Sequence, residues 1–537
     1  MKQRTIVKVF LVFIALFSMV ELILSTRYGP GVGGDATIYI TSARNLLDGN
    51  GLGLVGPRGE FRLLPYFPPF FSLVLGAIGF FKADLTAAAR WLNILMFSGL
   101  VYLSGSVMLR ITKSTGLAVI LAFLIAVSPV LIPVYAWAMS EPLSLLLGFA
   151  SLVLILDALQ QPEVNKYLYL AGLTAGLSFL TRYSSVAFAV AGLLGLLILW
   201  QVDWKRRLNG ALVFLGTSLI PMVIWVIYDV TRTATLASRS LETGDAVAAR
   251  VSSFWQNMQD ILLFWIIPDS WSVNPPYPSF INRLIVIIFL VFVVVWLLLA
   301  LWKLFGFLNK AYRDERFRMV VLLVLFIISY MSVILVVYIT TYPPITIGSR
   351  MLSPVHIAFL WLLVTLSGFT VFLWQGNRGL KSALALLLVL GVVWYGWRSA
   401  RIVQQYSQTG LGYNANEWRS SETIEAVKKL PAGTLIVTNE TNAVQYLAGR
   451  ASYPMMEIYQ EKPLPKFTRY GDGLIDGDEP QRLFREEGAV LIIFDTIDSQ
   501  MEGYYGQRTN ERLSALVDGL KRKFRGSDGG IFLYQPH

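Results

Sequence analysis

Two carboxylates and three arginines interrupt an otherwise apolar chain at points where chemistry can take place. Asp35 follows the first apolar segment, and Glu141 begins a later one; Arg90, Arg182 and Arg350 stand beside three others. An ionisable group at a bilayer boundary is by default a functional-site candidate. A carboxylate can deprotonate a hydroxyl, and the arginine fork binds phosphate in a bidentate way. Such a set could transfer a sugar from a lipid phosphate to a hydroxyl, because the arginines would stabilise the charge that builds on the leaving group.

The composition is that of a polytopic membrane protein. The chain has 537 residues, of which 55% are hydrophobic and 15% charged, and its mean hydropathy is +0.57. Its net charge of +11 is explained by lysines and arginines in cytoplasmic loops, so we expect no nucleic-acid partner. There are no cysteines, which excludes disulfides, thiolate metal sites and cysteine nucleophiles. With only two histidines, one of them the C-terminal His537, the chain has no histidine-rich metal cluster, and we expect no cofactor.

The apolar segments predict about eleven transmembrane helices, since most of them are long enough to span a bilayer; the segments 115–134 and 166–181 are short or interrupted. They run over 6–24, 88–109, 115–134, 142–159, 166–181, 184–201, 209–229, 281–303, 319–340, 351–374 and 380–397. The segment 68–81 is too short to cross and suits an interfacial or re-entrant helix. The first segment lacks a convincing cleavage site, so we read it as a retained helix rather than a signal peptide.

The basic residues orient these helices. If segment 68–81 does not cross, the basic clusters of the membrane half all fall in cytoplasmic loops, as the positive-inside rule requires. The N-terminus is then cytoplasmic. The first polar loop, 25–87, and a long loop, 230–280, face outward. The long loop holds two amphipathic stretches and several aromatic residues, which predict helices at the headgroup level; an ordinary loop with partner-facing helices is the alternative.

The last 140 or so residues turn polar and predict a small α/β domain, because helix and strand patterns alternate there. The expected order is a helix ended by Pro431, a strand at 434–438, a helix at 442–449, a strand at 489–496, an amphipathic helix at 511–524 and a strand at 530–535. No glycine-rich phosphate loop follows a strand. The predicted domains are therefore a transmembrane domain, 1–399, and an extracytoplasmic α/β domain, 400–537, which serves as a lid or an acceptor-recognition element.

Six short motifs, in order, resemble those of the GT-C glycosyltransferases, in the aminoarabinose-transferase-like and protein O-mannosyltransferase-like branch. They cover the first 200 residues and a stretch near 350. The matching residues are Asp35-Ala36 with Tyr39 and Ala43, Tyr66-Phe67-Pro68-Pro69, Ala88-Ala89-Arg90, Ser140-Glu141-Pro142, Thr181-Arg182-Tyr183, and Arg350-Met351-Leu352-Ser353-Pro354.

The resemblance implies a GT-C fold, a polyprenyl-phosphate-linked sugar donor and chemistry on the outer face of the cytoplasmic membrane. The acceptor could be a protein, a lipid or a polysaccharide. The family has an Asp-Glu pair where this chain has Asp35-Ala36, so no role of that glutamate carries over. The absence of a Trp-Trp-Asp-Tyr-Gly-like motif argues against the metal-dependent oligosaccharyltransferase branch, and we expect no metal.

The resemblance makes Asp35 the general base on the acceptor hydroxyl, with inversion at the anomeric carbon. As an alternative, Asp35 could cap a helix starting at Ala36. Glu141 is expected to line the cavity as a substrate ligand, or to be an acid favoured by a helix dipole.

The remaining candidates are assigned to the donor phosphate and its surroundings. Arg350 is expected to bind the phosphate, with Arg182 and Arg90 as further candidates; snorkelling to the interface is the alternative for Arg182 and Arg350. Tyr39 either contacts substrate or packs. His356 is a core histidine or, second, a phosphate-site contact.

Three rival functions remain. A ligase or polymerase using a lipid-diphosphate-linked glycan shares the broad chemistry. A transporter or flippase of lipid-linked sugars would show repeated halves with broken helices, and the sequence has no internal repeat. A membrane-anchored binding protein would not need eleven spans.

Overall fold

The chain forms two compact units. The computed structural model describes residues 2–63, 67–233, 240–241, 247–268, 271, 276, 278, 280–305, 314–342, 345–373, 378–455, 479–505, 517 and 520–534. The first unit, here the helical unit, comprises Met1–Arg27, Arg90–Tyr228 and Leu241–Gln408. The second, here the polar unit, comprises Tyr28–Ala89, Asp229–Ser240 and Thr409–His537. The first polar loop thus belongs with the C-terminal residues, whereas the sequence suggested two contiguous blocks.

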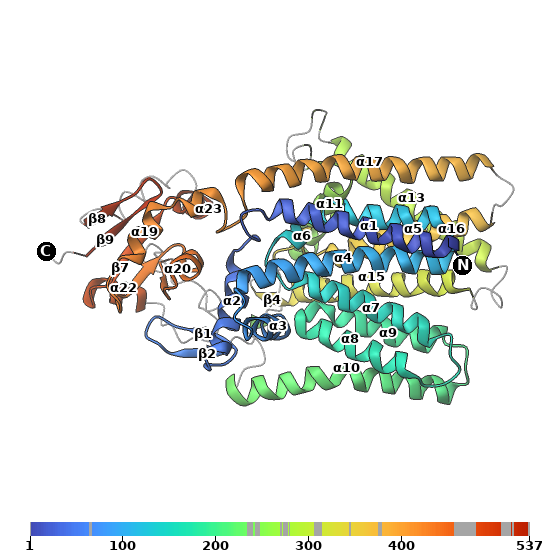
Figure 1. The fold of residues 1–537 in the computed structure, drawn as a ribbon, viewed down its shortest axis with the longest axis horizontal. Coiled ribbons are helices and arrows are strands. Elements are labelled where there is room, and N and C mark those ends of the chain that lie inside the picture. The colour runs from blue at the N-terminus through green and yellow to red at the C-terminus, as the bar shows by residue number, and fades with distance from the viewer. Residues whose placement is uncertain are drawn as a thin grey trace. The chain divides into compact units, whose positions relative to one another are not determined.

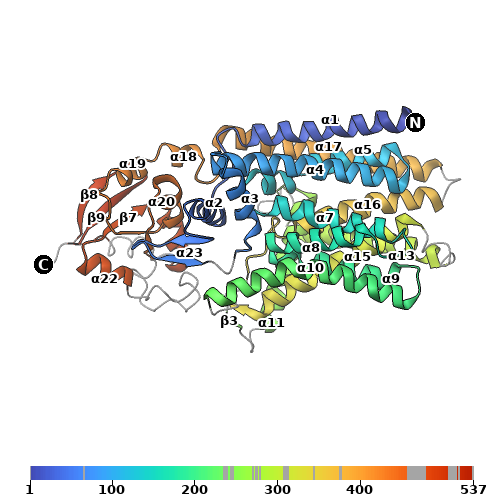
Figure 2. The same ribbon diagram turned by 60° about the horizontal axis from the view of Figure 1, so that its bottom comes forward.

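Long helices lie side by side in the helical unit (Figures 1 and 2). Their bounds are α1 Lys2–Ser25, α4 Leu85–Thr112, α5 Thr115–Ala126, α6 Leu131–Ala136, α7 Glu141–Ala158, α8 Lys166–Thr181, η1 Tyr183–Ser185 (a 3₁₀ turn), α9 Val186–Leu199, α10 Trp204–Thr233, α11 Val247–Ile266, α13 Phe280–Phe305, α15 Glu315–Thr340, α16 Ser353–Leu373 and α17 Arg378–Thr409. Short strands β3, Ser240–Leu241, and β4, Thr341–Tyr342, lie between them in sequence.

The eleven apolar segments fall on helices, one of them, 115–134, on the two helices α5 and α6, which confirms the fold class of a polytopic helical membrane protein. In the part of the chain that the structure describes, six helices are long and apolar enough to cross a membrane: Thr5–Ser25, Leu85–Thr112, Glu141–Ala158, Trp204–Tyr228, Glu315–Thr340 and Lys381–Thr409. Shorter apolar helices include Thr115–Ala126 and Ser353–Phe369. The total of eleven crossings stays a prediction.

Local signals explain where several of these helices begin. The side chains of Ser114, Asn165 and Asp314 each accept a hydrogen bond from a backbone N–H of the helix that follows, α5, α8 and α15 respectively. These are preferred N-cap residues, since they satisfy donors that have no partner inside the helix. The expected segment 115–134 is split into α5 and α6 around Ser128, whose backbone carbonyl accepts from two residues of α6.

Helices α2 and α3 form the first part of the polar unit, together with a small hairpin. Their bounds are α2 Gly34–Leu47, β1 Gly53–Val55, β2 Phe61–Leu63 and α3 Phe70–Gly79. The strands β1 and β2 pair antiparallel. With 10 residues, α3 is about 15 Å long, too short to cross a bilayer. It packs on α2, where the Ser72 hydroxyl donates to the Tyr39 carbonyl at 3.1 Å.

The C-terminal residues of the polar unit form a five-stranded sheet in the order β6-β5-β7-β9-β8. Strand β5 is parallel to β6 and β7, while β9 is antiparallel to β7 and β8. The bounds are α18 Asn416–Arg419, α19 Glu422–Lys428, β5 Ile436–Thr438, α20 Thr441–Ala448, β6 Tyr453–Pro454, α22 Glu479–Glu486, β7 Val490–Phe494, α23 Ile497–Tyr505, β8 Lys521–Arg525 and β9 Gly529–Leu533.

The small α/β domain and most of its elements agree with the sequence. The prediction is wrong for one element. Residues Lys521–Phe524 were expected to end a helix over 511–524, but they belong to strand β8. Residues 511–516 of that helix lie outside the described residues. Pairing with β9 overrides the local helix preference, because a strand that completes a sheet satisfies its backbone groups there.

Candidate active site

Glu141 is the first residue of α7 and is nearly fully buried. Its side chain is only 3% exposed, although it carries a charge. The helix starts there because Pro142 is preferred in the first turn, where its missing N–H costs nothing. The carboxylate also lies at the positive end of the helix dipole, which favours it. A buried carboxylate still needs a specific counter-charge.

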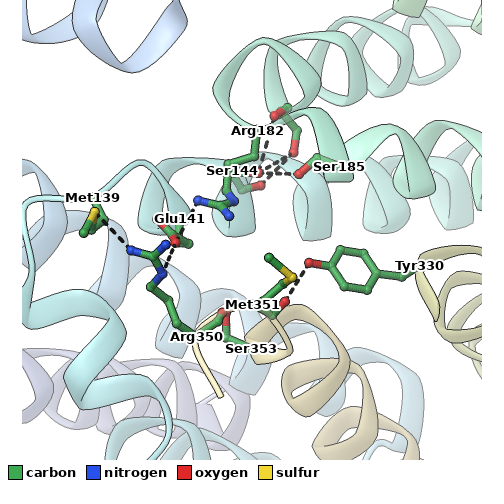
Figure 3. A network of polar contacts seen from close by, with 10 residues as sticks. Met139, Glu141, Ser144, Arg182, Ser185, Tyr330, Arg350, Met351 and Ser353 are labelled. Carbon is green, nitrogen blue, oxygen red and sulfur yellow. Dashed lines mark hydrogen bonds and ion pairs between the residues drawn. The ribbon is translucent and has the colours of Figure 1, made fainter. Parts of the chain in front are cut away.

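Two arginines from other elements supply that charge. The Arg182 Nη1 lies 2.7 Å from the Glu141 Oε1, and the Arg350 Nε lies 3.1 Å from the same oxygen. Figure 3 shows both guanidinium groups converging on the carboxylate. Arg182 is the residue that ends α8, with extended backbone, while Arg350 lies in the turn before α16. The structure therefore brings together three of the residues predicted from sequence.

Neutral groups hold the two arginine-bearing segments in place. The Ser144 hydroxyl lies 2.6 Å from the Ser185 hydroxyl and 3.1 Å from that of Ser178, which joins α7 to the turn around Arg182. The Tyr330 hydroxyl donates to the Met351 carbonyl at 2.6 Å, beside Arg350 (Figure 3).

Among these three side chains, two guanidinium groups face one carboxylate. The Arg350 side chain is 41% exposed, whereas that of Arg182 is 19% exposed. Arg350 therefore has both the charge and the access to bind an anion without losing its partner, Glu141. We name Glu141, Arg182 and Arg350 the cationic triad.

A second charged triad lies at the opposite end of α7. Arg110, in the last turn of α4, is 2.5 Å from Asp157 near the end of α7 and 3.2 Å from Glu315 at the start of α15. Here one guanidinium group faces two carboxylates. We name these three residues the anionic triad. Nearby, the Arg318 Nη1 donates to the Leu159 carbonyl at 2.9 Å, so the C-terminus of α7 has a cationic cap.

Asp35 lies in the polar unit, in the first turn of α2. The helix begins at Gly34 with Gly33 as its N-cap and has no side-chain cap, so Asp35 is not the N-cap of a helix that starts at Ala36. Its side chain is half-buried. Tyr39, one turn later, is 3% exposed, and its ring meets those of Phe67 and Phe71 edge-on at 5.3 Å each. This corresponds to the packing alternative for Tyr39. Tyr66, which precedes Phe67 in the motif Tyr66-Phe67-Pro68-Pro69, lies outside the described residues.

Arg90 and His356 lie in the helical unit in structural roles. The Arg90 guanidinium donates to the Thr26 hydroxyl at 2.9 Å and to the Ile23 carbonyl at 3.1 Å, and so caps the end of α1. His356 is fully buried, and its Nε2 lies 3.1 Å from the Ser128 hydroxyl. That is the environment of a core histidine. In the part of the chain that the structure describes, neither residue forms a hydrogen bond or ion pair with the cationic triad.

Sequence reasoning missed the neutral part of the site. Ser144 lies one turn after Glu141, and Ser178 lies one turn before Arg182, so helical spacing placed both near the charges. Tyr330 gave no such signal, because only the packing of α15 against α16 brings it to Arg350.

Comparisons with known proteins identify the fold. Residues 36–236 match the family model described as dolichyl-phosphate-mannose-protein mannosyltransferase. No curated protein sequence matches the chain significantly.

Among solved structures, the chain is similar to ArnT from Cupriavidus metallidurans bound to undecaprenyl phosphate, with a TM-score of 0.57 and 13% identity over 98% of this chain and 99% of that one. It is also similar to the archaeal oligosaccharyltransferase AglB from Archaeoglobus fulgidus in complex with an inhibitory peptide and a dolichol-phosphate. That match has a TM-score of 0.51 and 12% identity over 98% of this chain and 74% of that one.

Proposed function

We propose that the chain is a GT-C glycosyltransferase that moves one sugar from a polyprenyl-phosphate donor to an acceptor hydroxyl. The match of residues 36–236 to the mannosyltransferase family model and the similarity in fold to ArnT and AglB support this proposal. Two of the similar structures hold undecaprenyl phosphate and dolichol-phosphate, which supports a donor of that chemical class. The sugar is a hexose or a pentose. The acceptor is a protein, a lipid or a polysaccharide.

The observation that carries this proposal is the convergence of two guanidinium groups, one of them 41% exposed, on the single carboxylate of Glu141. A lipid-phosphate donor presents an anion, and its leaving group gains negative charge as the glycosidic bond breaks. The partly exposed Arg350 guanidinium binds that phosphate, while Glu141 keeps Arg350 and Arg182 in place. Cations already fixed in position stabilise the developing charge without reorganising, which is the most effective form of electrostatic catalysis.

Asp35 acts as the general base in the proposed reaction. The acceptor oxygen attacks the anomeric carbon, the bond from that carbon to the phosphate oxygen breaks, and its electron pair stays on the phosphate. The hydroxyl proton passes to the Asp35 carboxylate. Because one direct displacement takes place, the configuration at the anomeric carbon inverts. Arg350 neutralises the released phosphate, and no bound metal or cofactor enters the proposed reaction.

We place this reaction on the outer face of the cytoplasmic membrane. If segment 68–81 does not cross the membrane, the basic clusters of the membrane half fall in loops on the same side as the N-terminus, and basic loops remain in the cytoplasm. The polar unit and the cationic triad would then face outward. A reporter fused after residue 400 that gives a cytoplasmic signal would contradict this placement.

The function is tested by following radiolabelled sugar from polyprenyl-phosphate donors into membrane extract with the purified protein in detergent. We expect transfer by the wild type and a loss of at least 100-fold in Asp35→Asn, which is the lower end of the usual range of about 10²–10⁴-fold for a general base. Asp48→Asn is the matched control, because Asp48 follows α2 and is exposed; it should transfer at the wild-type rate.

Three outcomes would contradict the proposal. Equal transfer by wild type and Asp35→Asn would remove Asp35 as the base. Consumption of a lipid-diphosphate-linked glycan alone would indicate the ligase or polymerase. Movement of the lipid-linked sugar across a vesicle membrane without its consumption would indicate a transporter.

A further inference from the structure

The segment that leads into Asp35 is held by residues from the far end of the chain. Within the polar unit, Val32 and Gly412 form a parallel β-bridge. The Tyr413 N–H donates to the Val32 carbonyl at 2.8 Å, and the Asn414 Nδ2 donates to the Pro30 carbonyl at 2.7 Å. We name residues 411–414 the strap. Its bonds fix the backbone immediately before α2.

Two glycines show how closely the strap approaches. Gly412 has a φ of +54°, and a Cβ at that position would lie 2.1 Å from the Val32 carbonyl oxygen. Gly29 has a φ of +111°, and its Cβ would lie 2.8 Å from the Asn414 Nδ2. A backbone oxygen cannot move aside as a side-chain tip can, so Gly412 is required for this contact.

A second layer of side chains holds the strap itself. The Tyr446 hydroxyl donates to the Asn414 Oδ1 at 3.2 Å, so the two ends of the Asn414 amide are both engaged. The Tyr413 hydroxyl donates to Glu440 at 3.3 Å, and the rings of Tyr413 and Tyr446 stack with centroids 6.4 Å apart. Both Glu440 and Tyr446 belong to the region of α20.

Helix α20 also meets the start of α2 directly. A Cβ on Gly34 would find the Asn442 Nδ2 at 3.5 Å, an ordinary contact distance. Gly34 is the residue before Asp35. Burial raises the pKa of Glu440, although hydrogen bonds from Thr496, Tyr413 and Gln500 oppose part of that rise. The support of the strap is thus a partly buried hydrogen-bonded network.

We propose that Asn414 is a positioning residue for Asp35, so that the C-terminal domain is part of the catalytic machinery of a glycosyltransferase. This inference rests on the proposed role of Asp35. Asn414 touches neither substrate nor the reacting atoms. It fixes Pro30 and, with the Val32 bridge, the direction in which the chain enters α2, and this sets where the Asp35 carboxylate lies. A general base must lie within hydrogen-bond reach of the proton it takes, and a misplacement of 1 Å can cost about 100-fold in rate.

The test is Asn414→Asp, which keeps the size of the side chain. The new carboxylate still accepts from Tyr446, but it places an oxygen against the Pro30 carbonyl where a donor stood. We expect kcat to fall at least tenfold while KM for the donor changes less than twofold, because the donor phosphate binds in the helical unit. Tyr446→Phe, which frees one end of the amide without a new repulsion, should give a smaller fall. Asn416→Asp, exposed and two residues away, should match the wild type.

Hydrogen exchange of the backbone amides from residue 33 to residue 39 provides a readout independent of catalysis. Exchange should be faster in Asn414→Asp than in the wild type and unchanged in Asn416→Asp. An unchanged exchange rate, or an unchanged kcat in Asn414→Asp while Asp35→Asn is inactive, would overturn the positioning role and leave the proposed function standing. An active Asp35→Asn would instead overturn the proposed function, and the exchange measurement would still decide whether the strap orders α2.

Discussion

The two ends of α7 carry charged triads of opposite composition. At its first residue, Glu141 lies between Arg182 and Arg350; near its last residue, Asp157 shares Arg110 with Glu315. The helix has 18 residues and is therefore about 27 Å long, close to the thickness of a bilayer's hydrocarbon core. Both triads thus lie where a spanning helix reaches its two interfaces.

The helix dipole explains part of this difference. A carboxylate at the N-terminus of a helix is favoured, so Glu141 is stable there and its arginines remain able to bind another anion. A carboxylate at the C-terminus is disfavoured, so Asp157 needs Arg110. The anionic triad has no cation in excess and joins α4, α7 and α15. We therefore propose that the cationic triad binds a ligand and that the anionic triad serves helix packing.

Arg350→Met gives the largest effect and tests the cationic triad. The variant removes the exposed cation, so we expect kcat/KM for the polyprenyl-phosphate donor to fall about 100-fold or more, as for loss of one preorganised donor. Because the side chain is 41% exposed, the free energy of unfolding should change by less than about 1 kcal/mol. A transfer assay measures kcat/KM, and unfolding in detergent measures the stability. A near-normal kcat/KM would show that the phosphate binds elsewhere.

Glu141→Gln tests whether the carboxylate serves to hold the two arginines. The variant leaves both guanidinium groups without their counter-charge, and we expect a loss of about 2 kcal/mol in the free energy of unfolding, below the full cost of breaking a buried pair because Arg350 is partly hydrated. Polyprenyl phosphate should raise the melting temperature of this variant more than that of the wild type, since it supplies the missing anion. Equal shifts in both proteins would contradict anion binding at the triad.

Arg110→Met tests the anionic triad and is the matched control for Arg350→Met. Two partly exposed carboxylates lose their shared cation, so we expect a loss of about 1–2 kcal/mol in the free energy of unfolding. The transfer rate at a temperature where the protein stays folded should be within about twofold of the wild-type rate. If the rate fell as far as it does in Arg350→Met, the functional division between the two triads would be wrong.

Arg206→Ala provides the baseline for both triads. Arg206 and Asp203 form a surface pair, with side chains 55% and 58% exposed. We expect the free energy of unfolding to change by less than about 0.5 kcal/mol, because water screens such pairs. A larger loss would mean that any removed arginine destabilises the protein and that the effects at α7 are not specific.

The sequence predicted the cationic triad only in part. Glu141 and Arg182 could be placed at helix ends, because the apolar segments and Pro142 mark those ends. Both arginines contact one carboxylate oxygen only because of the way α7, α8 and α16 pack together. No local sequence pattern predicts that packing. The contacts of Arg90 with the end of α1 were not predicted either, because they depend on how α1 and α4 lie together.

More of the fold than of the candidate site could be predicted from the sequence. Apolar segments of spanning length impose helices, so the bundle followed from composition and length. Strand β8 did not follow, because its basic sequence shows no apolar alternation and depends on β9 for its conformation. The strap was also out of reach, since hydrogen bonds between distant residues leave no periodic trace in a sequence.

The strap affects when, during synthesis of the chain, the segment before Asp35 can reach its final structure. Asn414 and Pro30 are separated by 384 positions, and ribosomes add roughly 5–20 residues per second. The segment before Asp35 therefore waits roughly 20–80 s for its partner after it is made. During that interval the nascent chain already has its first helices but lacks a fixed base. We therefore expect a truncated product that stops before residue 411 to transfer no sugar.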